Sequence, residues 1–297
     1  MAPYVILTDS SCDVERDIVN SWGVDYTSLT LSFTDEPEKQ YSNDDLSIKD
    51  FYAQMRAGRI AKTAAVNKEV QADFFRKYLD QGCDIVYVGC SLKQSGSVNT
   101  ASVLAKKLTE EYPGSTIRCI NSLRASMGEG MLAIEAAKFA ENGTTADEVA
   151  EYINSRLNHL HEFCTAHTLD YLKRAGRVKA SSAFFGNLLG VKPIIVADAD
   201  GEQTAYKKVK GRSSSLSEIV LLLKEHIRDA ENQVVCLAHA DCSQDEVEEI
   251  KEIIRREIPC KEIYVGYIGQ IIGASIGPDA VAVFAFGDEQ TLRIGEK

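Results

Sequence analysis

The sequence predicts an α/β protein built from two α/β domains. Short apolar runs alternate with segments of helical periodicity through the first half of the 297-residue chain. This alternation is typical of a mainly parallel sheet flanked by helices. In the second half, strand-like runs also flank a hairpin-turn pattern, which predicts a mixed sheet. We therefore expect an N-terminal domain over residues 1–163 and a smaller C-terminal domain over residues 164–297.

The first strand is predicted at residues 4–7, and the polar residues 8–11 after it can cap a helix. Aromatic and β-branched residues over 22–34 predict another strand, whereas the charged stretch 33–43 predicts a surface loop. Residues 47–50 match a capping box that opens a short helix. This order already gives the strand, loop and helix sequence of a wound sheet.

The same unit repeats up to the middle of the chain. A helix is predicted over residues 69–78, so Thr63 is expected just outside its start. Strands are predicted at 85–88 and 115–120, the second followed by a helix through Ala140. A capping box at residues 145–148 begins a helix that we expect to run to about Glu162.

The pattern changes near residue 164. A short helix over 169–174 ends at Gly176, and a strongly apolar helix is predicted over 180–189. Strands at 193–196 and 204–209 flank the turn sequence at 198–201. These elements predict an antiparallel pair.

The rest of the chain predicts two further helices and three strands. The helices are expected to start at the capping sequences 215–218 and 243–246. The strands are predicted at 234–238, 263–268 and 280–286, and the Gly-rich segment 269–278 is expected to be a loop.

Composition excludes several classes of function. The formal net charge of −11 argues against a nucleic-acid-binding surface, which has to be basic. The eight cysteines form no CxxC pair, so a zinc or thioredoxin-type site is not expected. No apolar stretch approaches the ~18 residues of a membrane-spanning helix, and the start of the chain does not resemble a signal peptide. We expect a reduced, cytoplasmic protein.

The stretch over residues 90–101 is the first candidate ligand site. It joins a buried strand to a helix, so Ser91, Ser95, Gly96 and Ser97 fall at the carboxyl edge of the sheet, where open α/β sheets place their ligands. Hydroxyls around a glycine allow a small anion to approach closely. The alternative is an ordinary turn with a capping serine.

Catalytic and metal-binding signatures are absent from the sequence. There is no Walker A loop, HExxH motif, GxSxG elbow or paired-carboxylate signature. The glycines Gly128 and Gly130 match a dinucleotide fingerprint only formally, because no second strand with an acidic residue follows at the required distance. His159 and His161 point to different faces of the expected helix, so a shared metal is not predicted. We expect no cofactor and no enzyme activity.

Several short motifs in fixed order resemble the DegV family, whose members are also described as bacterial fatty-acid-binding proteins. They are Asp9-Ser10, Lys62-Thr63, Ser91-x-x-x-Ser95-Gly96-Ser97, residues 126–130, residues 169–177, residues 186–194, His239-Ala240 and Ile268-Gly269-x-x-Ile272-Gly273-x-x-x-Gly277-Pro278. Each motif alone is weak evidence for the family, but the order and spacing of all of them from about Tyr4 to Gly287 are specific to it.

The resemblance implies a long-chain fatty acid held in a slot between the two domains. It places the carboxyl group at Thr63, Ser95 and Gly96, with Ser275 in the nearby Gly-rich segment as a further contact. It also implies delivery of the acyl chain to a separate fatty acid kinase for phospholipid synthesis, with Arg177 contacting that partner. From the residues alone, Arg177 follows a helix-ending glycine and either reaches an anion or a partner or is simply solvated.

This chain departs from the usual family pattern at several positions. Residues 63–66 read Thr-Ala-Ala-Val where the family usually has Thr-Ser-Gln-Pro, Ser275 replaces a frequent His, and Lys210 replaces a frequent Arg. The alternative function is an enzyme that acts on a phosphate or a sugar acid with the same Ser/Gly loops and with Asp9 as base.

Overall fold

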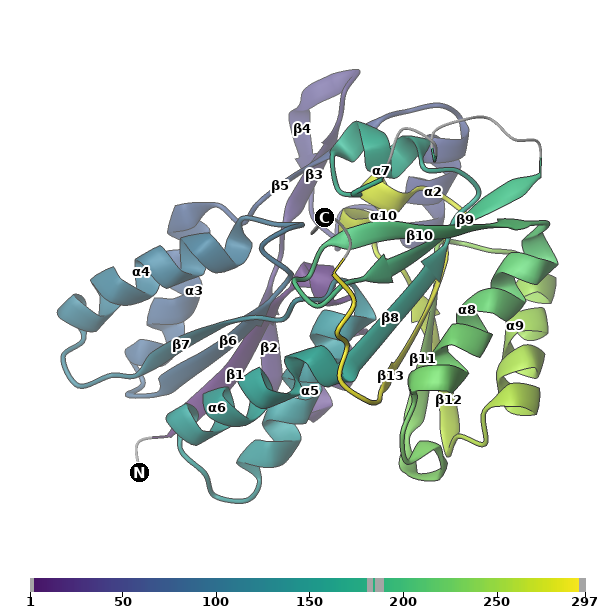
Figure 1. The fold of residues 1–297 in the computed structure, drawn as a ribbon. Coiled ribbons are helices and arrows are strands. Elements are labelled where there is room, and N and C mark those ends of the chain that lie inside the picture. The colour runs from purple at the N-terminus through teal and green to yellow at the C-terminus, as the bar shows by residue number, and fades with distance from the viewer. Residues whose placement is uncertain (1–2, 181–183, 185–189, 294–297) are drawn as a thin grey trace.

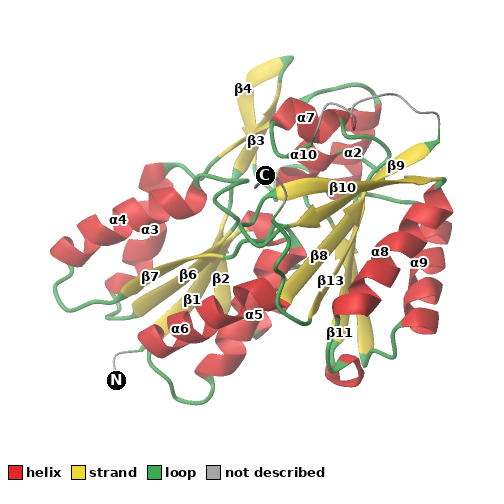
Figure 2. Cartoon of the chain, viewed as in Figure 1, coloured by secondary structure: helices red, strands yellow, loops and turns green. Residues whose placement is uncertain are grey.

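The computed structural model describes residues 3–180, 184 and 190–293. Figure 1 shows two large sheets side by side, with a small third sheet above them. In Figure 2 helices lie on the outer sides of both large sheets, between the two sheets and above them. The architecture confirms the prediction of a parallel sheet flanked by helices followed by a mixed sheet.

The N-terminal sheet has four parallel strands in the order β2-β1-β6-β7. Its strands are β1 (Tyr4–Asp9), β2 (Val24–Thr27), β6 (Asp84–Gly89) and β7 (Ile117–Asn121). Strand β6 is buried on both faces: Ile85 and Tyr87 join one apolar cluster, and Val86 and Val88 join another. A strand of this kind reads as a continuous apolar run, which is why the sequence predicted it.

Helices cover both faces of this sheet. The helices α3 (Lys68–Leu79) and α4 (Ser97–Glu111) pack on one face, and α5 (Met127–Ala140) and α6 (Ala146–Arg156) pack on the other. The predicted capping box of α6 is present, because the Thr145 hydroxyl accepts from the Glu148 N–H and the Glu148 carboxylate accepts from the Thr145 N–H. The short elements η1 (Ser10–Cys12) and α1 (Arg16–Ser21) connect β1 to β2.

A three-stranded antiparallel sheet, β4-β3-β5, stands above the two large sheets (Figure 1). Its strands are β3 (Thr30–Phe33), β4 (Glu36–Tyr41) and β5 (Ala61–Ala64), and α2 (Ile48–Arg56) lies between β4 and β5 in the chain. Two predictions are wrong here. The stretch 22–34 forms two strands, β2 and β3, in different sheets, and residues 36–41 of the expected surface loop form β4.

The C-terminal sheet has six strands in the order β10-β9-β8-β13-β11-β12, and only β11 and β12 run parallel. Its strands are β8 (Leu160–Thr165), β9 (Val191–Ala197), β10 (Gln203–Lys210), β11 (Val234–His239), β12 (Glu262–Tyr267) and β13 (Val281–Phe286). The helices α8 (Arg212–His226) and α9 (Gln244–Glu257) cover its outer face, with η2 (Leu157–His159) and η4 (Ala230–Asn232) in the connections. The β9–β10 hairpin and the Ser243 cap are confirmed.

The main error of the sequence analysis concerns β8. Helix α6 ends at Arg156, and the residues expected to continue it to Glu162 form a strand in the middle of the C-terminal sheet. The two polar residues His161 and Glu162 are buried there, so the strand does not show the usual alternation of apolar and polar residues. The predicted domain boundary between residues 163 and 164 falls inside β8, and the two-domain division stays a proposal.

Three smaller predictions concern the Gly-rich segment, the start of α8 and the helix expected over residues 180–189. The Gly-rich segment 269–278 contains a helix, α10 (Gln270–Ile276), which packs against α2, β5 and the short helix α7 (Asp170–Ala175). Gly277 permits this contact, because it adopts φ +86° and a Cβ atom there would collide with the Tyr171 ring. Helix α8 begins at Arg212 rather than at the predicted cap at 215. The predicted helix over 180–189 lies outside the described residues, except at positions 180 and 184.

Candidate functional site

A pocket lies between the two large sheets, with the small sheet and α10 forming its upper wall. The space between its lining residues measures about 880 Å³, a volume that includes open solvent at its opening. Its walls come from the carboxyl edge of the N-terminal sheet, the inner face of the C-terminal sheet, β5, the start of α4, and α10. Segments far apart in the sequence therefore meet around one space.

We call the buried face of the C-terminal sheet the floor of the pocket. Five of its side chains lie in register on three neighbouring strands: Glu162 and Cys164 on β8, Phe284 and Ala282 opposite them on β13, and Ile195 on β9. Residues two apart on a strand share a face, which is why these side chains line the pocket while Phe163 and Val283 face α8. Together with Gln203 of β10, these residues form a buried surface that is mostly apolar.

We call the exposed or half-buried residues at the polar end of the pocket its mouth: Thr63, Gln94, Ser95, Gly96, Arg177 and Ser275. The five residues predicted to contact the ligand or a partner all line this one pocket: Thr63, Ser95, Gly96, Arg177 and Ser275. They come from four parts of the chain, because Ser95 and Gly96 are neighbours in the turn before α4. Thr63 lies on β5 rather than before a helix, and Ser275 lies on α10 rather than in a loop.

The serines of the turn after β6 have different local roles. The Ser91 hydroxyl is buried and donates to the Gly201 carbonyl at 2.7 Å, so it holds the turn against the C-terminal half. The Ser95 oxygen accepts from the Ser97 N–H at 3.2 Å and lies 3.0 Å from the Ser97 hydroxyl. Gly96 is the N-cap of α4 and has no side chain to cap it, so the Ser95 oxygen, one residue earlier, accepts from the first helical N–H; Ser95 lines the pocket as well.

Arg177 and Gln94 form a second polar group at the mouth. The Arg177 Nε donates to the Gln94 carbonyl at 3.0 Å, and one guanidinium N–H group donates to the Ala175 carbonyl at 2.5 Å. The Gln94 Nε2 is buried and has no hydrogen-bond partner, although its residue lines the pocket. A buried amide donor without a partner is costly, so this nitrogen is available to an oxygen of a ligand. The sequence analysis missed Gln94, whose only sign was its position before Ser95.

Behind the pocket lies a buried acidic cluster that includes Asp9. Tyr87 donates to Asp9 Oδ2 at 2.6 Å, and the Ser11 hydroxyl oxygen lies beside both Asp9 Oδ1 and Glu129 Oε2. The single Ser11 proton can serve only one of these carboxyls, so the other must be protonated and donate to Ser11. Burial raises the pKa of Asp9, and burial followed by the Asp9 charge raises that of Glu129 well above its ordinary value. Asp9 is not among the residues lining the pocket, which weakens its assignment as a catalytic base.

The floor carries its own carboxyl group, Glu162, which the sequence analysis did not single out. Its Oε2 accepts from the Ala125 N–H at 3.2 Å, and its Oε1 accepts from Gln203 Nε2 at 2.5 Å. Burial raises the pKa of Glu162 to about 7, against the opposing effects of the Ala125 N–H and the Arg124 charge. The floor is therefore poorly suited to a second negative charge.

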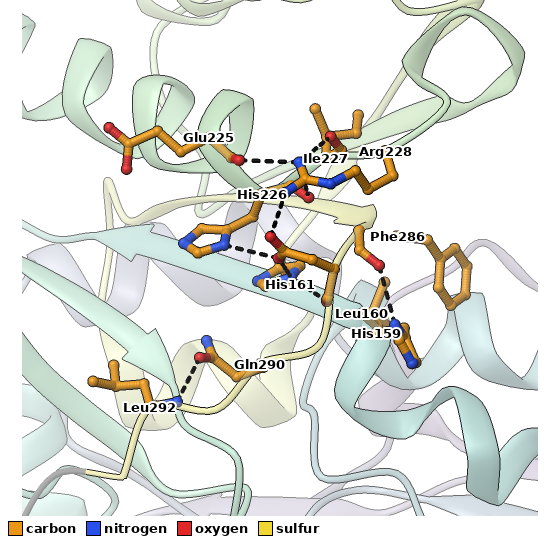
Figure 3. Close-up of polar contacts among 12 residues, drawn as sticks. His159, Leu160, His161, Glu225, His226, Ile227, Arg228, Phe286, Gln290 and Leu292 are labelled. Atoms are coloured by element: carbon orange, nitrogen blue, oxygen red, sulfur yellow. Dashed lines mark hydrogen bonds and ion pairs between the residues drawn. The ribbon is translucent and has the colours of Figure 1, made fainter.

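A separate polar cluster lies near the C-terminal end of the described chain (Figure 3). The His161 Nε2 lies 2.9 Å from the Asp288 carbonyl, and His226 Nδ1 lies 2.9 Å from Asp288 Oδ1. A carbonyl only accepts, so His161 Nε2 carries a proton and has no lone pair for a metal. Arg228 also pairs with Asp288 Oδ2 at 2.5 Å and brings a positive charge to the cluster. We assign no metal there.

The structure also bears on the expected state of the cysteines and on membrane-spanning segments. None of the eight cysteines, all of which lie in the described part of the chain, forms a disulfide. Among the residues that the structure describes, no helix has the length and apolar character that crossing a membrane requires.

Comparisons with known proteins agree on one family. The family model described as "uncharacterised protein, DegV family" matches residues 3–288. A DegV domain-containing protein of Clostridium perfringens is 32% identical over 288 residues, which cover 97% of this chain and 99% of the relative. A DegV domain-containing protein of Caldanaerobacter subterraneus is 27% identical over 284 residues, covering 96% and 99%.

Solved structures show the same fold. A fatty-acid-binding DegV family protein of Thermus thermophilus matches with a TM-score of 0.85 at 22% identity, covering 97% of this chain and all of the other. A DegV family protein of Ruminococcus gnavus, solved with vaccenic acid, matches with a TM-score of 0.84 at 22% identity, covering 95% and 99%. At this identity the likeness shows the fold, and the ligands belong to those proteins.

Proposed function

The chain belongs to the DegV family, and we propose that it is a fatty-acid carrier that binds one long acyl chain in the pocket between its two large sheets. The observation that carries the proposal is the polarity of this pocket. Uncharged and cationic donors gather at its mouth, and a mostly apolar floor lies behind them. Solved relatives of the same fold are described as binding fatty acids.

The floor and α10 offer the apolar contacts that an acyl chain needs. The isoleucines Ile268, Ile271, Ile272 and Ile276 line the pocket together with Ile195 and Phe284 of the floor. Burying a 16-carbon chain at ~0.8 kcal/mol per CH₂ gains on the order of 10 kcal/mol before the costs of ordering it. Apolar contact is therefore the main source of affinity in this proposal.

The polar and charged groups around the pocket indicate which end of the fatty acid lies at the mouth. A carboxylate at the mouth would meet the Thr63 and Ser95 hydroxyls and the unpartnered Gln94 amide, in a pocket that Arg177 also lines. A carboxylate at the floor would meet Glu162, with further buried acids behind Ser11. Above its raised pKa of about 7, Glu162 is charged and would repel a carboxylate where water is excluded, so the head group belongs at the mouth. Gly96 and Ser275 complete the proposed head-group contacts.

The proposal includes a partner protein. A head group at the mouth is accessible to a fatty acid kinase, which would convert the acid to an acyl phosphate for phospholipid synthesis, and the exposed Arg177 is the residue we assign to that contact. The unpaired cysteines are in keeping with a cytoplasmic location. In this scheme the protein itself catalyses no reaction.

Mass spectrometry of ligands released from the purified, denatured protein tests the proposal. We expect close to one fatty acid per chain. Recovery of a phosphorylated metabolite in its place would favour the enzyme alternative, and recovery of neither from a protein that also fails to bind added fatty acid would end the carrier proposal.

The head-group assignment predicts a selective loss of affinity. Replacing Thr63 with valine and Ser95 with alanine removes two hydroxyls from the mouth while keeping its shape. We expect binding of a free fatty acid to weaken about tenfold or more, because two hydrogen bonds to a charged group are lost. Binding of the matching methyl ester should change much less. Equal losses for acid and ester, measured by displacement of a fluorescent acyl probe, would contradict the assignment.

The partner assignment predicts separable effects for Arg177. We expect Arg177→Ala to keep most of its bound lipid, because the apolar contacts remain, and to lose most acyl-phosphate formation with a cognate kinase. Arg174→Ala, which changes an exposed arginine on α7 that is not among the residues lining the pocket, is the matched control. If Arg177→Ala releases the lipid, Arg177 holds the head group and the partner assignment is wrong.

A further inference from the structure

The buried polar pair Glu162–Gln203 interrupts the otherwise mostly apolar floor of the pocket. Glu162 is 5% exposed and Gln203 is 7% exposed, and both line the pocket. A carboxylate offers about four acceptor positions, and the structure fills two of them, one from the Ala125 N–H and one from Gln203. Part of the acceptor capacity of Glu162 therefore remains open.

No cation of the described chain uses this remaining capacity. Arg124 is fully buried nearby, but its Nε donates to the Leu160 carbonyl at 2.6 Å and its Nη1 donates to the Leu123 carbonyl at 2.7 Å. The Arg124 charge acts on Glu162 through space, without a hydrogen bond that the structure records. Glu162 is therefore not half of a closed ion pair, as structural buried carboxylates commonly are.

A plain saturated chain is a poor match for this part of the floor. Methylene groups packed against Glu162 would displace water and offer no proton to its open acceptor positions, so each oxygen would keep only its one bond, from the Ala125 N–H or from Gln203. A second carboxylate is disfavoured there, because above pH 7 it would face the Glu162 charge in a buried site. The group that fits is neutral, small, able to donate a hydrogen bond, and carried on a chain long enough to reach the floor from the mouth.

We propose that the preferred ligand is a long-chain fatty acid with a hydroxyl group on its chain, and that this hydroxyl donates a hydrogen bond to Glu162 beside Gln203. The proposal rests on the function proposed above and specifies its ligand class. Glu162 and Gln203 act as specificity-determining residues, and the carboxyl head group stays at the mouth.

The test compares stearic acid with a set of hydroxystearic acids that carry the hydroxyl at successive positions, using displacement of a fluorescent acyl probe from the full chain. We expect at least one positional isomer to bind about tenfold more tightly than stearic acid. Glu162→Leu should abolish this preference and bind stearic acid at least as well as the wild type does. Cys164→Ala, which changes the neighbouring floor position without removing an acceptor, should keep the preference.

The outcomes separate this inference from the proposed function. If stearic acid binds as tightly as every hydroxy isomer, or if Glu162→Leu keeps the preference, the inference is wrong and the carrier function stands. If no acid binds, both are wrong. Should Glu162→Leu fail to fold in a thermal melt, Glu162→Met serves in its place, because it also removes the acceptor oxygens. A preference for the hydroxy acid that survives this change overturns the inference.

Discussion

Replacing Ala282 with phenylalanine is expected to reduce the fatty acid recovered with the purified protein at least tenfold. Ala282 lies on β13, is 4% exposed, and faces the pocket opposite Cys164. A phenyl ring there would occupy the space in which the proposed acyl chain lies, so the ligand would lose several methylene contacts at ~0.8 kcal/mol each. Mass spectrometry of the released lipid, with the protein concentration measured in the same sample, gives the occupancy.

The matched control is Ala285→Phe on the same strand. Ala285 is also buried, but it faces α8 on the other side of the sheet. There it packs within an apolar cluster and does not line the pocket. Overpacking there should cost about 1–3 kcal/mol of stability, and we expect any molecules that fold to keep their lipid. Ala282→Phe should be destabilised less, because its ring enters open space. Full lipid occupancy in Ala282→Phe would show that the acyl chain does not lie on this floor.

Replacing Glu162 with glutamine should change the pH dependence of stability by about 3 kcal/mol. Burial raises the pKa of Glu162 in the folded protein from its ordinary 4.5 to about 7, so the folded state holds this proton more tightly than the unfolded state. Between these two values stability falls as pH rises, because the unfolded chain releases the proton first. At ~1.4 kcal/mol per pKa unit, the wild type loses about 3 kcal/mol relative to the variant between pH 4.5 and pH 8.

Urea unfolding of the ligand-free proteins at a series of pH values measures this difference. Taking the difference between the two proteins cancels the buried acids that do not interact with Glu162, and it leaves only the smaller effect of the Glu162 charge on Asp13, whose pKa burial raises to about 8. Glu148→Gln gives a control of opposite sign, since the Thr145 N–H and hydroxyl hold the pKa of Glu148 below its ordinary value. The stability of the wild type relative to Glu148→Gln should rise as the pH approaches 4.5 and then stay constant. A Glu162→Gln difference that is constant from pH 4.5 to pH 8 would contradict the burial of a neutral carboxyl in the floor.

The sequence predicted elements well where local chemistry decides them. The apolar run of β6, the turn between β9 and β10, and the caps at Ser47, Thr145 and Ser243 each depend on residues within a few positions, and all are present. It failed at β8, where His161 and Glu162 resemble the polar face of a helix. They are buried because the strand lies between β9 and β13 in the finished sheet.

The sequence by itself determined the α/β class, the order of most elements and the family, because alternating periodicity, caps and spaced motifs are properties of neighbouring residues. Only the tertiary structure decided that Thr63, Ser95, Arg177 and Ser275 line one pocket, that Gln94 offers an unpartnered donor there, and that Glu162 lies in its floor. The physical reason is that burial and proximity depend on how distant segments pack. A carboxyl group acquires an unusual proton affinity only when strands from elsewhere in the chain remove its water.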